Sequence, residues 1–346
     1  MIHRLCLLLL LVLLTPWVRA EYETITTDVH KFEKVADGVY FVTGIGKVFV
    51  MSNSLVIVND DGVVVVDSHI TPAAARSLIT DIKRVTDKPV TTLINSHFHY
   101  DHSHGNQSFG PDIEIIGHEF TRARMTAAPL EEATFLRDKI NMPKYLEGLQ
   151  TKLAATTDEA ERRTVEGQIE MLKNHIEATK EITPLAPNVT MNDRMTLFRG
   201  GREIQLLFLG RAHTAGDIAI FLPKERVVFT GDMMLGGVSW LGDGYVDEWP
   251  ATLEKLKALD FDIMLPGHGP IITERNRIDF VQAYYRDLWQ KARALHDAGV
   301  TAENAAKQVD LTAHAQTLGV AEAGADPLAV SRIYELLDGP AKARAQ

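Results

Sequence analysis

Residues of the types that bind metal ions crowd into one short segment, His97-Phe98-His99-Tyr100-Asp101-His102, which directly follows a predicted strand. Residues two apart in an extended segment point the same way, so His97 and His99 can converge on one ion. Asp101 and His102 face elsewhere and can serve a second ion. The segment therefore predicts a site for two metal ions with nitrogen and oxygen ligands.

Three later turns, all containing glycine, each place one more suitable ligand just beyond a predicted strand. They are Gly210-Arg211-Ala212-His213-Thr214, Thr230-Gly231-Asp232 and Pro266-Gly267-His268-Gly269-Pro270. Ligands on tight loops at strand ends suit a metal site, because the scaffold fixes the geometry while the loops stay accessible. We expect His213, Asp232 and His268 to meet the first segment at one edge of a sheet.

Two ions held there would support hydrolysis. Divalent ions about 3.5–4 Å apart depress the pKa of a bridging water, so that a metal-bound hydroxide nucleophile exists at neutral pH. One ion polarises a substrate carbonyl and stabilises its oxyanion, while the other orients the nucleophile. Asp101 and Asp232 are the predicted catalytic residues, and Asp101 can also hold the proton of the water.

The first twenty residues have the pattern of a secretory signal peptide. Arg4 gives a positive start, residues 7–14 are unbroken apolar, and Val18-Arg19-Ala20 forms a small-residue cleavage site. The apolar run is well short of the roughly 20 residues of a spanning helix, so we expect cleavage, a periplasmic or secreted protein, and no stable membrane insertion. The only cysteine, Cys6, leaves with this segment, which excludes thiolate ligands, a cysteine nucleophile and disulfides from the mature chain.

The charge balance indicates the kind of partner. The chain has 36 basic and 46 acidic residues and a formal net charge of −10. Nucleic-acid binding draws most of its affinity from concentrated Lys and Arg, so we expect no nucleic-acid partner. A small-molecule substrate fits better, and we expect a monomer or a homodimer.

The order of the predicted elements indicates an α/β fold. The sequence predicts strands within 38–67, a helix at 71–86, a strand at 90–94, a strand at 113–116, strands within 196–230, a helix at 250–259, a strand at 263–265 and helices within 276–337. Two halves, each with hairpins followed by a helix, predict two packed sheets flanked by helices.

A long charged stretch, residues 119–183, interrupts the β-pattern and predicts a helical hairpin. Apolar residues in its second half fall four, three and four apart, as on one helix face: Val165, Ile169, Leu172 and Ile176. Such stripes usually face a core, so packing on the domain is favoured over a dimer interface or a substrate lid.

The order of these ligands resembles that of the metallo-β-lactamase-fold hydrolase superfamily, in which a histidine-rich loop is followed by His, Asp and His. The resemblance covers about Val39 to Pro270. It implies a four-layer αββα sandwich with two metal ions, usually Zn²⁺ although iron or manganese can also be bound, in the groove between the sheets. It implies a role for each ligand: His97, His99 and His213 on the first metal, Asp101, His102 and His268 on the second, and Asp232 as the bridge.

Together these patterns divide the chain into a signal peptide at 1–20, a metallo-β-lactamase-like domain at 21–300 with the helical insertion at 119–183, and a C-terminal helical extension at 301–346.

Substrate contacts are expected on two segments. The tip at Gly44–Phe49 resembles a hairpin that folds over the groove in relatives, and an aromatic wall follows Asp232. The candidates are Lys47, Phe49, Trp240 and Tyr245.

Residue identity narrows the choice within the superfamily. β-Lactamases that use a cysteine at the second metal are excluded by Asp232, and glyoxalase-type thioesterases usually set the final histidine in Gly-His-Glu-Tyr, not in Gly267-His268-Gly269-Pro270. We therefore expect an exported dinuclear zinc hydrolase that attacks the carbonyl of a β-lactam, a lactone or an ester. A glyoxalase-type thioesterase, a non-hydrolytic iron oxidoreductase and a scaffold protein that uses its hairpin are the alternatives.

Overall fold

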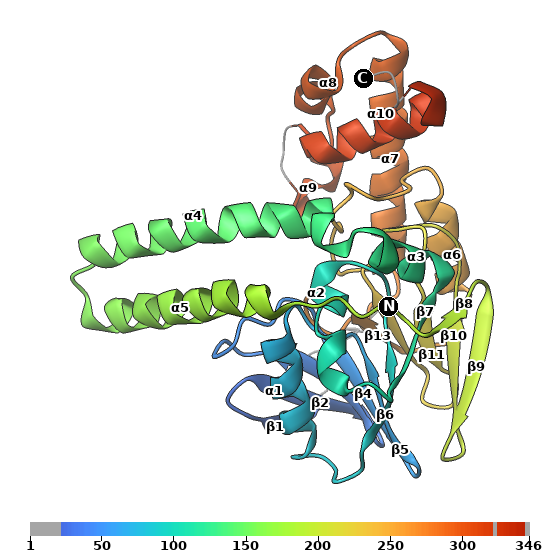
Figure 1. Ribbon diagram of the computed structural model, residues 1–346. Coiled ribbons are helices and arrows are strands. Elements are labelled where there is room, and N and C mark those ends of the chain that lie inside the picture. Colours follow the sequence, from blue (N-terminus) through green and yellow to red (C-terminus); the bar gives the residue numbers. More distant parts are fainter. Residues whose placement is uncertain (1–21, 321–323, 343–346) are drawn as a thin grey trace, which may run out of the picture.

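The computed structural model describes residues 22–320 and 324–342 (Figure 1). The predicted signal peptide at 1–20 lies outside the described residues. Among the residues that are described, no helix combines the length and the apolar character needed to cross a membrane.

Two sheets form the centre of the molecule (Figure 1). The first runs in chain order through β1 (Glu23–Thr26), β2 (His30–Ala36), β3 (Val39–Gly44), β4 (Ser54–Asn59), β5 (Gly62–Val66), β6 (Val90–Ile94), β7 (Glu114–His118) and β8 (Val189–Met191). The second has the order β13 (Ile263–Pro266), β12 (Val227–Gly231), β11 (Ala219–Leu222), β10 (Arg202–Leu207) and β9 (Arg194–Arg199). Strands β5 to β8 pair in parallel, as do β12 and β13, and the other pairs are antiparallel.

Alternate residues of the buried strand β5 face two different cores. Val64 and Val66 belong to the core between the sheets, whereas Val63 and Val65 pack with α1 (Pro72–Ile82) on the outer face. Because both faces are covered, this strand is a continuous apolar run. Helices α6 (Trp249–Lys257) and α7 (Arg277–Asp297) cover the second sheet in the same way, which completes the predicted four-layer αββα sandwich.

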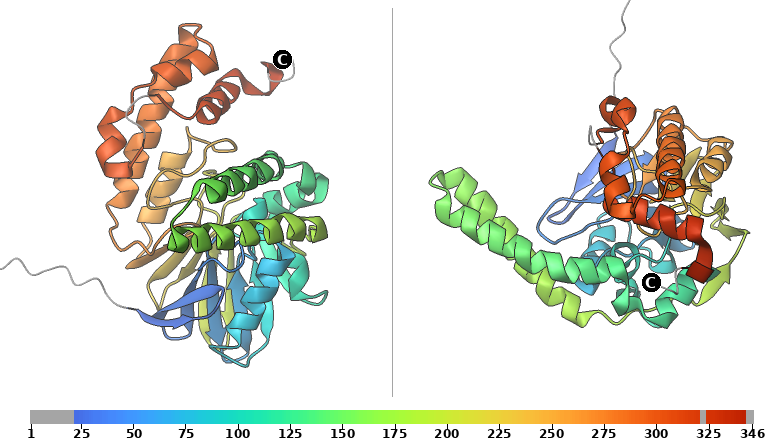
Figure 2. Two further views of the ribbon diagram at one scale, coloured as in Figure 1. Left: turned by 90° about the vertical axis from the view of Figure 1, so that its left-hand side faces the viewer. Right: turned by 90° about the horizontal axis from the view of Figure 1, so that it is seen from above.

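The C-terminal helices extend the layer formed by α6 and α7 (Figure 2). They are α8 (Ala302–Gln308), α9 (Thr312–Leu318) and α10 (Pro327–Lys342). Ala305, Val330 and Ile333 belong to the same buried cluster as Leu288 of α7. The predicted boundary between residues 300 and 301 stays a prediction.

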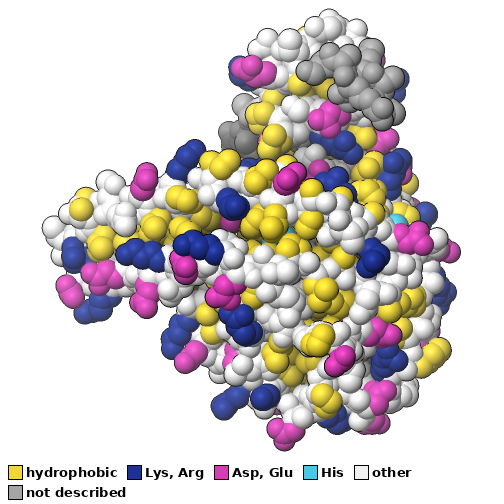
Figure 3. All heavy atoms as spheres, viewed as in Figure 1, with side chains coloured by type: hydrophobic (Ala, Val, Ile, Leu, Met, Phe, Trp, Pro, Cys, Tyr) yellow, Lys and Arg dark blue, Asp and Glu magenta, His cyan; other side chains and the backbone are white. Residues whose placement is uncertain are grey.

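The predicted helical insertion contains α3 (Glu119–Ala127), α4 (Ala133–Ala155) and α5 (Glu159–Ala178), and α4 and α5 form an antiparallel hairpin that extends away from the sheets (Figure 2). The apolar stripe of α5 packs against Leu149 and its neighbours on α4. The expectation that this stripe packs on the domain is therefore wrong, because each helix of the hairpin buries the other. Hydrophobic side chains also reach the surface along the hairpin (Figure 3), where Ile140 and Tyr145 of α4 are exposed.

Short helical turns complete the chain: α2 (Tyr100–Ser103), η1 (Asn106–Phe109), η2 (Pro129–Glu131) and η3 (Thr179–Glu181). The sequence did not predict β1, β2 or β8. Strand β1 is short, polar and mostly exposed, and β8 is only three residues long, so neither carries an apolar pattern of its own.

Candidate metal centre

The seven predicted ligands lie on loops that leave strand ends of both sheets. His97 and His99 follow β6, and Asp101 and His102 lie in α2 immediately afterwards. The other three come from the second sheet: His213 between β10 and β11, Asp232 directly after β12, and His268 two residues after the end of β13. The site is therefore built across the two sheets. The expectation that the four segments meet at one edge of a single sheet is wrong, because β6 belongs to the first sheet and β10 to β13 belong to the second.

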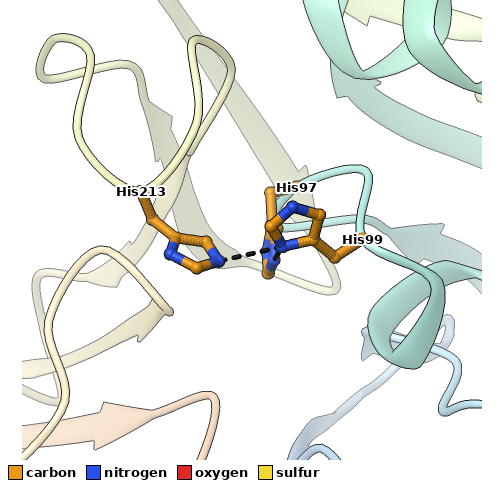
Figure 4. A group of neighbouring side chains, drawn as sticks. All are labelled: His97, His99 and His213. Atoms are coloured by element: carbon orange, nitrogen blue, oxygen red, sulfur yellow. Dashed lines mark hydrogen bonds between the residues drawn. The ribbon is translucent and has the colours of Figure 1, made fainter. Parts of the chain in front are cut away.

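Three histidines form the first group (Figure 4). The Nδ1 atom of His99 lies 3.1 Å from Nε2 of His97 and 2.9 Å from Nε2 of His213. All three side chains are buried.

The second group joins the histidine-rich segment to the last loop. Nε2 of His268 lies 3.1 Å from Oδ2 of Asp101 and 3.2 Å from Nε2 of His102. The Asp232 carboxylate lies between the groups, with Oδ2 3.6 Å from His213 Nε2 and Oδ1 3.4 Å from His102 Nε2. This is the position that a bridging ligand requires.

Outer hydrogen bonds fix the tautomers of four of the histidines. His99 Nε2 donates to Oδ2 of Asp243 at 3.0 Å, and His102 Nδ1 donates to Oδ2 of Asp67 at 2.7 Å. His268 Nδ1 donates to the Met51 carbonyl at 3.1 Å. The Ser96 hydroxyl already donates to Asp67, so it accepts from His97 Nδ1 at 3.1 Å.

These tautomers test whether the site fits a metal. In the neutral rings, the inward nitrogens of His97, His99, His102 and His268 carry lone pairs, and lone pairs that converge need a cation between them. Tetrahedral zinc with bonds of 2.0–2.1 Å spaces its ligand atoms about 3.3 Å apart, close to the distances found here. Oδ1 of Asp232 is buried and has no hydrogen-bond partner within the described ranges. The residues therefore fit divalent metal ions.

The electrostatics divide the site into two parts. Burial, reinforced by His99, lowers the pKa of His213 to about 3, and burial also lowers the pKa of His97, so both rings stay neutral. Burial acts in the same direction on His268, but Asp232 and Asp101 outweigh it and raise its pKa to about 10. A metal ion at the second group must therefore displace a proton, which couples binding to pH.

Two carboxylates that hold ligand histidines from outside the ligand set, Asp67 and Asp243, were not predicted from the sequence. Asp67 follows the apolar run of β5 and is fully buried, while Asp243 lies between two glycines in the loop after β12. An aspartate directly after a buried strand is a usable signal for Asp67. No comparable signal marks Asp243, whose role depends on a contact 144 residues away in sequence.

A glycine lets the last two loops approach each other. A Cβ atom on Gly267 would lie 2.2 Å from Oδ1 of Asp232 and 2.9 Å from Cε1 of His102. The Gly-His pattern in this loop therefore reflects a close approach of backbone to the candidate bridging carboxylate.

Of the four predicted substrate contacts, the structure brings Trp240 to the ligands. Its ring centroid lies 5.6 Å from that of His99. The other three have different partners: Lys47 pairs with Asp28, Phe49 packs on His175 of α5, and Tyr245 lies beneath Arg211 and Arg332.

The base of the hairpin reaches the ligand segment through buried polar contacts. The hydroxyl of Tyr100, the residue between His99 and Asp101, donates to Oδ1 of Asp138 on α4 at 3.3 Å. His175 on α5 contacts the other oxygen of Asp138 at the same distance. Both hairpin helices are thereby connected to the candidate metal centre.

The two facing sheets and the clustered histidines and aspartates define a metal-binding αββα protein. A family model described as the metallo-beta-lactamase superfamily matches residues 48–268, and the chain belongs to this superfamily.

Individual relatives are distant. The chain is 23% identical over 274 residues to a linear primary-alkylsulfatase of Pseudomonas sp. (strain ATCC 19151), an alignment that covers 73% of this chain and 49% of the relative. It is also 23% identical over 265 residues to metallo-beta-lactamase type 2 of Bacteroides fragilis, covering 73% of this chain and 84% of that protein. A stereoselective inverting sec-alkylsulfatase from Pseudomonas sp. has a similar fold, with a TM-score of 0.64 and 16% identity over 90% of this chain and 51% of the other. The chain thus spans about half the length of the alkylsulfatases that it matches.

Proposed function

We propose that the protein is an exported dinuclear zinc hydrolase that cleaves a small substrate with a reactive carbonyl: a β-lactam, a lactone or an ester. The convergence of seven ligand side chains from both sheets, with Asp232 between the two groups, carries this proposal. The proposal of export depends on the N-terminal sequence pattern.

When bound, two zinc ions supply an activated water and a Lewis acid for the carbonyl oxygen. The chain contributes the geometry of the site. Asp243, Asp67 and the Met51 carbonyl hold three of the rings in position, so little reorganisation is needed when substrate binds. Burial opposes ionisation of Asp101, but His102 and His268 outweigh it and keep the pKa of this carboxyl low, so that Asp101 stays a carboxylate whose oxygens can accept a hydrogen bond from the attacking water.

The test is hydrolysis of a chromogenic cephalosporin, a lactone and a p-nitrophenyl ester by zinc-loaded protein, with a chelated sample and Asp232→Ala as controls. We expect chelator-sensitive turnover of at least one substrate with kcat/KM of about 10⁴ M⁻¹s⁻¹ or more. Metal analysis of protein purified without added metal separates zinc from iron. Two bound ions without turnover of any of the three substrates would contradict the proposal.

A second candidate is hydrolysis of an anionic ester such as an alkyl sulfate. The guanidinium carbon of Arg137 lies 4.9 Å from the ring centroid of Trp240, which itself packs on His99. This cation has no carboxylate partner within 22–320 and 324–342, so it is free to meet a negatively charged group. The names of the alkylsulfatase relatives support the same chemistry.

Decyl sulfate and p-nitrophenyl sulfate distinguish the two candidates. If sulfate esters are substrates, we expect Arg137→Gln to raise KM for them while leaving KM for a neutral ester unchanged. Lys139→Gln, at an exposed position two residues along the same helix, is the matched control.

A further inference from the structure

An apolar cleft lies between the loop that follows β12 and the C-terminal helical layer. Its volume is about 520 Å³, within the range of small-molecule sites. Its walls include Val238, Trp240 and Leu241 from the loop, Tyr284 from α7, and Leu311 from the turn before α9.

The loop wall of this cleft is built together with the candidate metal centre. Trp240 lines the cleft and also packs on His99 and, at 6.3 Å between centroids, on His213. The Ser239 hydroxyl, also in the wall, donates to the backbone carbonyl of Asp232 at 2.8 Å. A ligand in the cleft would therefore contact the side chain of Trp240, which itself packs on two of the candidate ligand histidines.

The position of the indole depends on a glycine. A Cβ atom on Gly242 would lie 2.1 Å from Cζ2 of Trp240, so only glycine lets the ring fold back over the chain at this point. Replacing Gly242 would displace the shared wall without removing any candidate ligand.

The lining of the cleft favours an uncharged apolar ligand. Leu241 and Leu311 are almost fully buried. Burial, with a smaller contribution from Asp326, raises the pKa of Tyr284 to about 12, as expected for a hydroxyl in weakly polar surroundings. Asp326 is the one charged residue of the described lining, and its carboxylate opposes an anionic chain end.

From these contacts we infer that the cleft binds the uncharged acyl or alkyl chain of a substrate whose reactive group lies at the metal centre. This inference rests on the proposed hydrolase function, and it makes the C-terminal helices part of the specificity site. Because burial of each additional methylene group of the chain favours binding, the affinity for substrate should increase with chain length.

The first test is a series of p-nitrophenyl esters from acetate to decanoate. For the natural protein we expect kcat/KM to rise by about 10²- to 10³-fold between acetate and octanoate, which differ by six methylene groups. Val238→Trp fills the cleft and should abolish this rise, whereas Leu311→Ala enlarges it and should move the optimum to longer chains. Phe280→Ala, on the outer side of α7 and outside the lining, is the matched control.

A second measurement needs neither metal nor turnover. Calorimetric titration of the chelated protein with 1-octanol should show binding that Val238→Trp and Gly242→Ala lose and Phe280→Ala keeps. Octanol binding of this pattern without hydrolysis of any ester would support the cleft and refute the hydrolase. If every folded variant hydrolyses esters with the same dependence on chain length and none binds octanol, the proposed role of the cleft is refuted, whereas the proposed hydrolase function is supported.

Discussion

At the scale of single residues, the outer hydrogen bonds explain why the candidate ligands are ordered. Asp243 and Asp67 each hold one imidazole through the nitrogen that faces away from the centre, so each ring presents the opposite nitrogen as a lone pair. The two carboxylates serve different groups: Asp243 supports His99 of the first, and Asp67 supports His102 of the second. Their removal should therefore have separable effects.

We predict that Asp67→Asn weakens the affinity of the second metal site about 10–100-fold, and that Asp243→Ala does the same for the first site. Competition with a chromophoric chelator, which resolves two binding steps, measures both affinities. Equal losses at the two sites in each variant would show that the carboxylates do not act through the rings that they contact.

His104 should make the protein sensitive to acid. Burial lowers its pKa to about 4, from an ordinary value of 6.5. Because the pKa of His104 is lower in the folded state than in the unfolded state, its neutral form contributes fully to the stability of the fold only above about pH 6.5. This contribution is lost as the pH falls toward 4, and the loss amounts to about 2 kcal/mol at pH 5. Urea titrations of metal-free protein measure the fall in the free energy of unfolding between pH 7.5 and pH 5. This fall should be about 2 kcal/mol smaller for His104→Gln than for the natural protein.

At the scale of elements, the ligand loops were predictable because each follows a predicted strand and three of the four contain glycine. The pairs Gly231-Asp232 and Gly267-His268 are local signals of this kind. The outer contacts were not predictable, because they join loops that meet only after both sheets form. The hairpin was predicted, but the packing of its two helices on each other was not, because the apolar stripe of a helix does not identify the element that packs against it.

The hairpin should loosen independently of the sheets. Leu172 is almost fully buried against α4, so Leu172→Ala should destabilise the hairpin by about 3 kcal/mol. Hydrogen exchange should accelerate across residues 133–178 and stay unchanged in the strands, with metal stoichiometry preserved. Ile140→Ala, at an exposed position of α4, is the control for a lost apolar side chain.

At the scale of the whole molecule, the sequence predicted the four layers and the C-terminal helices, but not that these helices share one buried cluster with α6 and α7. The small residues involved, such as Ala305 and Ala306, carry no pattern that identifies a partner. The specificity site inferred above depends on this packing, which explains why it could not be derived from the sequence.

Metal removal should destabilise the entire αββα body. An ion present at 1,000 times its Kd stabilises the folded state by about 4 kcal/mol, and these ligands join the two sheets. Thermal unfolding with zinc and after chelation should show a clear fall in Tm, reduced in Asp232→Ala. An unchanged Tm in a protein shown to bind two ions would mean that the ions bind the unfolded chain equally well.

The division of the ligands between the sheets has a consequence for assembly of the protein. His97 to His102 are complete as a local cluster early in the chain, yet each group in the structure also needs a side chain from beyond residue 212. A chain in which the second sheet has docked out of register cannot bring His213 and His268 to their groups together. High-affinity binding of two ions would therefore stabilise only molecules in which the two sheets have docked in the correct register.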